Sequence, residues 1–161
     1  MWFHRPFRLD DWLLKTEPDA FSIDDLKNAP EQTSMWDGVR NYQARNFLRD
    51  GFKQGDLVMI YHSSCKQVGV AGIATVSREA YADPTQFDLN SDYYDAKATA
   101  DNPRWFVVDV TYQSHLKKLV SLQAIKANDA ITEIALKKGG RLSVMPVTEH
   151  DWQQIIAMSE R

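Results

Sequence analysis

Stretches with the pattern of β-strands follow one another along this chain with only short helical stretches between them, and this order constrains the fold most. A parallel doubly wound sheet needs a regular helix between successive strands, so that fold is excluded. We therefore predict an α+β fold on a small curved or closed sheet of about five or six strands. Strand patterns occupy residues 12–15, 56–62, 68–77, 105–112 and 141–145.

The helical segments carry their own start and stop signals. Ser22 and Asp25 form a capping box, and Gly51 ends the second segment. In the second strand pair, Gly69 and Gly72 predict bulges or a close approach of backbone. Helical patterns cover residues 21–26, 41–49, 122–128, 131–137 and a last segment that Thr148 caps. Residues 83–103 are polar, acidic and aromatic without a clear period, which is typical of a functional insert.

The composition is that of one globular domain. The chain has 161 residues, 43% hydrophobic and 25% charged, enough to bury a core without disulfides or metals. Its one cysteine, Cys65, excludes an intrachain disulfide and any cysteine-based zinc cluster, which favours the reducing cytoplasm. No run has the length of a membrane span or the pattern of a signal peptide. We expect a disordered N-terminal extension over residues 1–10, a domain over 11–161, and a cytoplasmic, monomeric or weakly dimeric protein.

The charge is low overall and unevenly distributed. A net charge of −3 argues against a protein that coats nucleic acid non-specifically. From Arg40 to Lys53 the ionised residues are basic except for Asp50, whereas from Glu79 to Asp101 they are acidic except for Lys97. A small basic segment on an acidic body fits recognition of one nucleotide better than wrapping of a duplex.

The run from Trp36 to Asn46, W-D-G-V-R-N-Y-Q-A-R-N, is the most informative motif. Trp36 offers a flat face, and Asp37 and Asn41 offer hydrogen-bonding groups. Arg40 and Arg45 are candidate contacts for phosphate. This combination favours binding of a planar polar group such as a nucleobase. The alternative is that Trp36 is a core residue and Asp37 belongs only to a turn before a helix.

Four short blocks stand in order along the chain: Lys15-Thr16-Glu17-Pro18, the run from Trp36 to Asn46, Tyr61-His62-Ser63, and Arg141-Leu142-Ser143-Val144 with Pro146. Together they closely resemble the EVE domain family, whose members are PUA-like small mixed β-barrels with short flanking helices, similar to the YTH readers of methylated adenine in RNA. The likeness runs from about Trp12 to the C-terminal helix. The leader departs from the family pattern, in which the first strand begins almost at once.

The resemblance implies a non-catalytic reader that holds a flipped, modified base of DNA or RNA in an aromatic-walled pocket, without cofactor or metal. Trp36 would form one wall, and Glu17, Asp37, Asn41 and Ser63 would read polar edges. The second wall stays open among Tyr81, Phe87, Tyr93, Tyr94 and Trp105. The other residues placed around the pocket by the motifs are Lys15, Thr16, Tyr61, His62, Arg141, Leu142 and Ser143.

Two other classes of function remain open. A hydrolase would use His62 with Ser63 or Cys65, although adjacent residues on a strand point to opposite faces. A protein-interaction adaptor would dock through Trp105, Phe106 and the acidic insert. The four histidines are scattered without the spacing of metal ligands, and Gly139-Gly140 lacks the lysine of a phosphate-binding loop.

Overall fold

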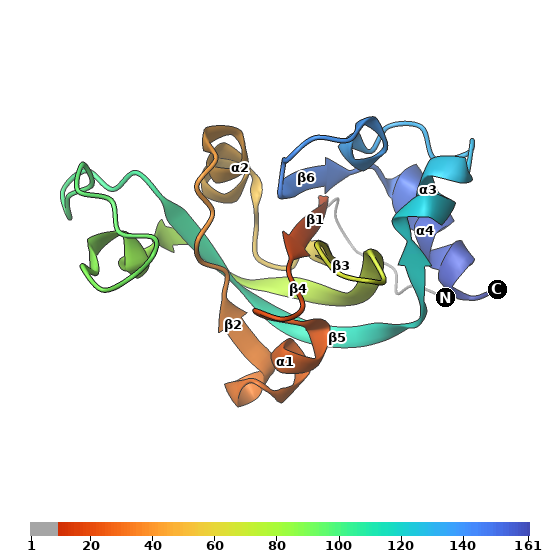
Figure 1. The fold of residues 1–161 in the computed structure, drawn as a ribbon, viewed down its shortest axis with the longest axis horizontal. Coiled ribbons are helices and arrows are strands. Elements are labelled where there is room, and N and C mark those ends of the chain that lie inside the picture. Colours follow the sequence, from red (N-terminus) through yellow and green to blue (C-terminus); the bar gives the residue numbers. More distant parts are fainter. Residues whose placement is uncertain (1–9) are drawn as a thin grey trace.

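The computed structural model describes residues 10–161 and shows a mixed six-stranded sheet with the order β2-β5-β4-β3-β1-β6. Strand β1 pairs with β3 in parallel, and the other neighbours pair antiparallel. The sheet is twisted but does not close, because β2 and β6 remain its edges (Figure 1). The predicted α+β, PUA-like mixed sheet is thus confirmed. The strands are β1 (Asp11–Thr16), β2 (Thr33–Met35), β3 (Leu57–His62), β4 (Gly69–Ala82), β5 (Phe106–Ser121) and β6 (Val144–Val147).

The helices are short, and their predicted caps are confirmed. Ser22 and Asp25 form the capping box, and Thr148 accepts a hydrogen bond from the Asp151 amide at the start of α4. The helices are α1 (Ile23–Asn28), α2 (Tyr42–Asn46), α3 (Leu122–Ala127) and α4 (Glu149–Ser159). Shorter turns are η1 (Pro30–Gln32), η3 (Pro84–Phe87) and η4 (Ala135–Lys138), and α2 runs on into a π-helical turn, η2 (Phe47–Gly51).

Three segments differ from the sequence-based expectation. Strands β4 and β5 form a ribbon longer than predicted, and four register shifts allow it to continue through polar residues. Residues 131–137 form no α-helix. Ile131 and Ile134 are buried in an irregular segment, so their spacing reflects core packing. Strand β6 starts at Val144, where it pairs with Leu14. Residues 141–143, predicted as strand, therefore precede it.

Both faces of the sheet are buried. Leu13 and Leu14 are successive residues of β1, yet they belong to different hydrophobic clusters because adjacent side chains point to opposite faces. Helices α1 and α2 and the loop with Trp36 cover one face, and α3 and α4 cover the other. This two-sided burial explains why β1 and β3 read as continuous apolar runs. The insert between β4 and β5 lies at the end of the long ribbon away from α3 and α4 (Figure 1).

Glycines allow the close approaches that the sequence predicts. A Cβ at Gly69 would lie 2.3 Å from the Val120 carbonyl oxygen, and one at Gly72 would lie 2.6 Å from the Ile23 side chain. The second contact brings α1 tightly against β4. Since Phe21 directly precedes α1, this packing also fixes one wall of the cavity described below.

The predicted extension over residues 1–10 falls, apart from Asp10, outside the described residues. Among the helices of residues 10–161, none combines the length and the apolar character that crossing a membrane requires.

Candidate functional site

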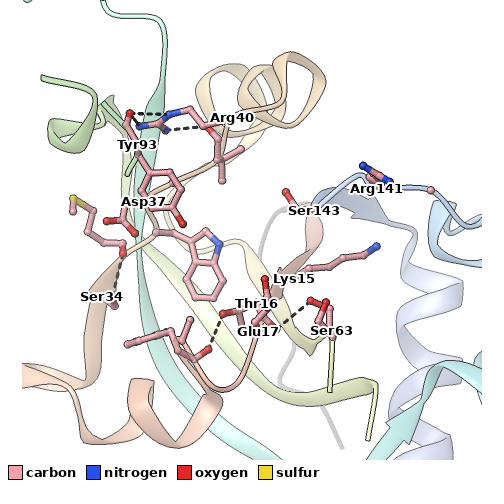
Figure 2. A pocket seen from close by; sticks show the side chains of 18 residues that line it. Lys15, Thr16, Glu17, Ser34, Asp37, Arg40, Ser63, Tyr93, Arg141 and Ser143 are labelled. Carbon is pink, nitrogen blue, oxygen red and sulfur yellow. Dashed lines mark hydrogen bonds between the residues drawn. The ribbon is translucent and has the colours of Figure 1, made fainter. Parts of the chain in front are cut away.

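A cavity of about 660 Å³ lies at one end of the sheet, where the C-terminal end of β1 meets the loop after β2, the loop after β3 and the segment before β6 (Figure 2). It brings together most of the motif residues, although they are far apart in sequence. The predicted site residues that line it are Lys15, Thr16, Glu17, Trp36, Asp37, Ser63, Arg141 and Ser143, and Arg40 lines it as well.

Backbone hydrogen bonds at the strand ends assemble this cavity. The Ser63 amide donates to the Thr16 carbonyl oxygen at 2.9 Å, and the Lys15 amide donates to the Ser143 carbonyl oxygen at 2.9 Å. The Thr16 hydroxyl donates to the Phe21 carbonyl oxygen at 2.7 Å, which folds the segment after β1 back over the cavity. The short motif blocks are therefore neighbours because the sheet pairs their strands.

Trp36 belongs to both the core and the cavity. Only 8% of it is exposed, and it is part of the hydrophobic cluster on the α1 side of the sheet. Its ring meets that of Phe21 edge to face, with 6.0 Å between the centroids. The two interpretations of Trp36 from sequence are thus not exclusive, because a buried indole also lines the cavity.

Tyr93 is the second aromatic residue at the mouth of the cavity. Of the five candidates in or beside the insert, it alone lines the cavity formed by the described residues. Gly38 permits this approach: its φ is +80°, and a Cβ there would lie 2.7 Å from Cζ of the Tyr93 ring. Trp105, another candidate, is buried and stacks on Tyr42 at 5.0 Å between centroids.

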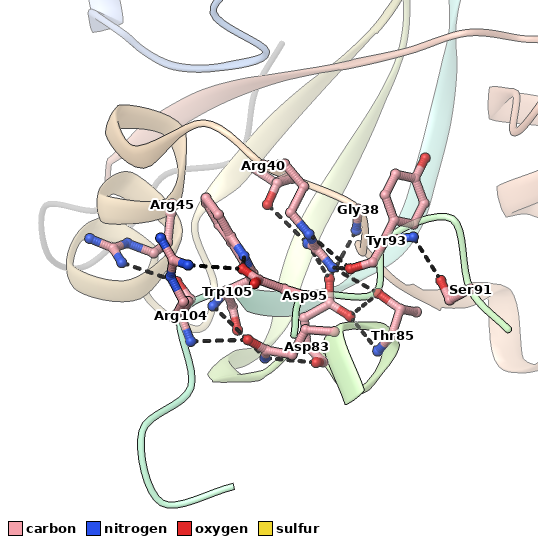
Figure 3. Close-up of polar contacts among 12 residues, drawn as sticks. Gly38, Arg40, Arg45, Asp83, Thr85, Ser91, Tyr93, Asp95, Arg104 and Trp105 are labelled. Carbon is pink, nitrogen blue, oxygen red and sulfur yellow. Dashed lines mark hydrogen bonds and ion pairs between the residues drawn. The ribbon is translucent and has the colours of Figure 1, made fainter. Parts of the chain in front are cut away.

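Arg40 and Asp83 hold the insert in place (Figure 3). The Arg40 guanidinium donates to the Asp83 carboxylate at 3.0 Å, to the Tyr93 carbonyl oxygen at 2.8 Å and to the Thr85 hydroxyl at 3.1 Å. The same carboxylate oxygen accepts from the Gly38 amide at 3.0 Å. Burial alone would raise the pKa of Asp83, but hydrogen bonds from Thr85, Gly38 and Arg40 outweigh it and lower this pKa.

The two arginines predicted as phosphate contacts are engaged within the protein. Arg40 makes the contacts just described, and Arg45 donates to the Asn46 side chain at 2.9 Å and to the Arg104 carbonyl oxygen at 3.0 Å. Their guanidinium groups already have acceptors, so binding of phosphate would compete with these bonds. Of the two, Arg40 is the one that fixes the acidic insert.

Besides Arg45, four predicted site residues lie outside the cavity lining, and each has another role. The Asn41 side chain caps α2 by accepting from the Ala44 amide at 2.9 Å. Tyr61 is 2% exposed, and burial raises its pKa to about 12. His62 accepts at Nε2 from the Ile23 amide at 3.1 Å, and burial lowers the pKa of its imidazole. Leu142 packs against both hydrophobic clusters.

The hydrolase alternative depends on His62 as a base for Ser63 or Cys65. The imidazole nitrogen that could accept a proton already accepts from Ile23. The Ser63 hydroxyl is directed to the Thr16 carbonyl oxygen at 3.4 Å instead. Within residues 10–161, no hydrogen bond joins His62 to Ser63 or Cys65. Nor do these residues contain a group of three or more His, Cys, Asp or Glu side chains placed to hold a metal ion.

The charged residues of the cavity divide between its two sides (Figure 2). Lys15 and Arg141 lie on the β6 side, and neither has an ion-pair partner among the described residues. Desolvation lowers the pKa of Lys15, whose ammonium lies 5.6 Å from the centroid of the Tyr61 ring. Asp37 lies on the Tyr93 side, where desolvation and the nearby Asp83 carboxylate raise its pKa. The β6 side is thus the cationic side of the cavity, while the Tyr93 side carries both Asp37 and Arg40.

Sequence reasoning missed part of the lining. Phe21, Ser34, Met35 and Ser64 also face the cavity. Phe21 lies just before the capping box of α1. Its aromatic side chain was the one feature of the sequence that could have indicated a place in the cavity lining. Ser34 and Met35 lie on β2, which has no strand pattern of its own and forms by pairing with β5.

The sequence profile of the EVE domain matches residues 10–158. The chain belongs to the EVE domain family. It is 39% identical over 167 residues to human thymocyte nuclear protein 1, and the match spans 93% of this chain and 74% of the human protein. The crystal structure of human THYN1 protein in complex with DNA containing 5-methylcytosine superposes with a TM-score of 0.90 at 38% identity, covering 94% and 98% of the two chains.

A more distant likeness concerns the fold of this EVE domain alone. The YTH domain of the Zygosaccharomyces rouxii MRB1 protein, solved with N6-methyladenosine RNA, superposes with a TM-score of 0.56 at 11% identity, covering 99% of this chain and 92% of that one. The predicted similarity of EVE and YTH folds is confirmed by this match.

The expected cytoplasmic location is contradicted by the relatives. Curated EVE proteins from human, zebrafish and chicken, 39–40% identical to this chain, are named thymocyte nuclear protein 1. The expectation rested on the single cysteine and on the lack of a signal peptide. Both features also suit the nucleus, where disulfides are equally rare.

Proposed function

We propose that this EVE domain is a non-catalytic reader that binds a flipped, modified base of DNA or RNA in the cavity between Trp36 and Tyr93. The observation that carries the proposal is the pairing of these aromatic residues around a cavity of about 660 Å³ that charged and hydroxyl side chains also line. The human relative solved with 5-methylcytosine DNA supports the ligand class.

The energetics fit a reader of modest affinity. Stacking of a base on an aromatic ring contributes roughly 1–3 kcal/mol, while extrusion of the base costs a few kcal/mol. Full burial of a methyl group adds about 0.8 kcal/mol, a severalfold preference. Because Phe21 and Met35 make part of the lining apolar, a base methyl group has a surface to pack on.

Three polar side chains that line the cavity would read the edge of the base. Glu17 and Asp37 are exposed carboxylates at the cavity, suited to accept from an exocyclic amine. The Ser63 hydroxyl can both accept and donate. Asn41, the fourth reader predicted from sequence, is committed to its helix cap and is left out of the proposal.

The cationic side would hold the phosphate next to the flipped base. Lys15 and Arg141 replace Arg40 and Arg45 in this role, because their charged groups are not occupied by other described residues, whereas those of Arg40 and Arg45 are. A lysine and an arginine at the mouth of a base pocket bind phosphate without reading sequence.

The test is a titration with short oligonucleotides of DNA and RNA that carry one modified or one unmodified base, at fixed salt. Tyr93→Ala is the informative variant, because Tyr93 is 44% exposed and its removal should leave the fold intact. Tyr94→Ala is the matched control, since Tyr94 is 41% exposed and does not line the cavity. Preference for the modified base, lost in Tyr93→Ala alone, is the expected result. Equal binding of modified and unmodified oligonucleotides by the wild type would refute the proposal.

An adaptor function has one observation in its favour. Among residues 10–161, four of the five exposed large hydrophobic side chains belong to the insert, namely Phe87, Leu89, Tyr93 and Tyr94. Exposed apolar side chains gathered in one segment are typical of a docking surface. A protein partner would be affected by Leu89→Ser and Tyr94→Ala, two changes outside the cavity lining that should leave base binding unchanged.

A further inference from the structure

A second groove, of about 610 Å³, lies on the other side of the loop that follows β3. Its polar lining comes from Lys66 and Gln67 of that loop, Lys118 and Ser121 of β5, and Gln123 of α3. It shares no lining residue with the cavity of the proposed function.

Sheet register places the groove and the cavity at the same end of the molecule. Thr16 pairs with His62 at the ends of β1 and β3, His62 pairs with Gly69, and Gly69 pairs with Ser121. The loop over residues 63–68 lies between them. Ser63 and Ser64 face the cavity, whereas Lys66 and Gln67 face the groove. A ligand leaving the cavity over this loop would enter the groove.

The groove carries positive charge that no carboxylate of its lining neutralises. Lys66 and Lys118 are exposed, form no ion pair within the described part of the chain, and share the groove with no carboxylate. Lys117 is different, because its ammonium pairs with the Glu160 carboxylate at 2.8 Å. Two uncompensated lysines with two side-chain amides match the groups that contact nucleic-acid phosphates.

We propose that this groove binds backbone phosphates of nucleotides next to the flipped base, a proposal that rests on the proposed function for the adjacent cavity. The cavity would take the base, and the groove would set the path of the strand. Contacts of this kind add affinity that depends on salt and not on the base. They also explain how a protein of net charge −3 retains a strand.

The test compares Lys66→Gln/Lys118→Gln with Lys117→Gln, a matched control on the same strand. Each protein is titrated over a range of salt with a single-stranded oligonucleotide that carries the modified base, with its unmodified counterpart, and with the modified nucleoside alone. The logarithm of the binding constant falls linearly with the logarithm of the salt concentration, and each lost phosphate contact reduces the magnitude of this slope by about 0.7 on a single strand. We expect the double variant to lose about 1.4 of this slope, to keep its preference for the modified base, and to bind the nucleoside unchanged.

The outcomes separate the two proposals. A double variant whose salt slope equals that of Lys117→Gln would refute phosphate binding in the groove, whether or not the wild type prefers the modified base. Wild-type protein without preference for the modified base, combined with a reduced slope in the double variant, would refute the reader function and leave the groove as a backbone site.

Discussion

Nη1 of Arg40 lies 3.0 Å from Oδ2 of the fully buried Asp83, and this pair joins the loop that carries Trp36 to the start of the acidic insert. The same guanidinium binds the Tyr93 carbonyl oxygen at 2.8 Å, so it also places the second aromatic residue over the cavity. A contact between two charged residues thereby fixes the position of Tyr93 relative to Trp36 across the cavity.

Asp83→Asn should therefore weaken both the fold and the binding of a base. The change leaves the partly buried Arg40 charge without its counterion and weakens the hydrogen bond that the Gly38 amide donates to residue 83. We expect a loss of about 1–3 kcal/mol in the free energy of unfolding, measured by urea denaturation. Arg49→Gln, at an exposed pair with Asp50, is the control and should leave the free energy of unfolding nearly unchanged. An Asp83→Asn variant as stable as wild type would contradict a structural role for the Arg40–Asp83 ion pair.

The pH dependence of stability follows from the same carboxylate. Hydrogen bonds hold the pKa of Asp83 below its ordinary value in the folded protein. An aspartate with a lowered folded pKa contributes stability above its unfolded pKa of about 3.9 and loses that contribution as the pH falls through the folded value. Wild type should therefore lose more stability than Asp83→Asn between pH 5 and pH 2. Parallel pH profiles from urea denaturation would exclude this linkage.

Trp36→Ala should destabilise the protein as well as remove a wall of the cavity. Since the indole is 8% exposed and packs in the core, its truncation should cost about 3–5 kcal/mol. Loss of binding in this variant is consequently ambiguous. Trp36→Phe keeps an aromatic face and should retain the fold with weakened base binding. Denaturation midpoints for both variants, measured beside their oligonucleotide affinities, separate folding from recognition.

Binding of a base with an exocyclic amine should weaken in mild acid if Asp37 accepts from that amine. Desolvation and the Asp83 carboxylate raise the pKa of Asp37. As the pH falls through this raised value, the carboxylate takes up a proton and loses part of its capacity to accept. Affinity should fall severalfold in wild type between pH 7 and pH 4.5, and Asp37→Asn should show a flatter profile. A steep profile in the variant would assign the titration to another group.

Local features of the fold could be predicted from sequence, and contacts between distant segments could not. Ser22 and Thr148 predict the starts of their helices, because an N-cap binds a backbone amide only three residues further along the chain. The motif blocks anticipated much of the cavity lining. Tyr93 could not be distinguished by sequence from the other aromatic candidates for the second wall. Its position depends on Arg40 and Gly38, which are more than fifty residues earlier in the chain. The role of Arg40 could not be predicted for the same reason, since its acceptors Asp83, Thr85 and Tyr93 lie in the insert.

Gly38→Ala should disturb the cavity more than so small a change suggests. The φ of +80° disfavours any residue with a Cβ, and that atom would lie 2.7 Å from the Tyr93 ring. We expect a loss of about 1–3 kcal/mol in stability and a several-fold loss of base affinity, because the ring must move away from the cavity. In Gly38→Ala/Tyr93→Ala the steric part of the cost should disappear while the backbone strain remains. A double-mutant cycle by urea denaturation measures this difference, and strictly additive effects would show that Gly38 and Tyr93 do not interact.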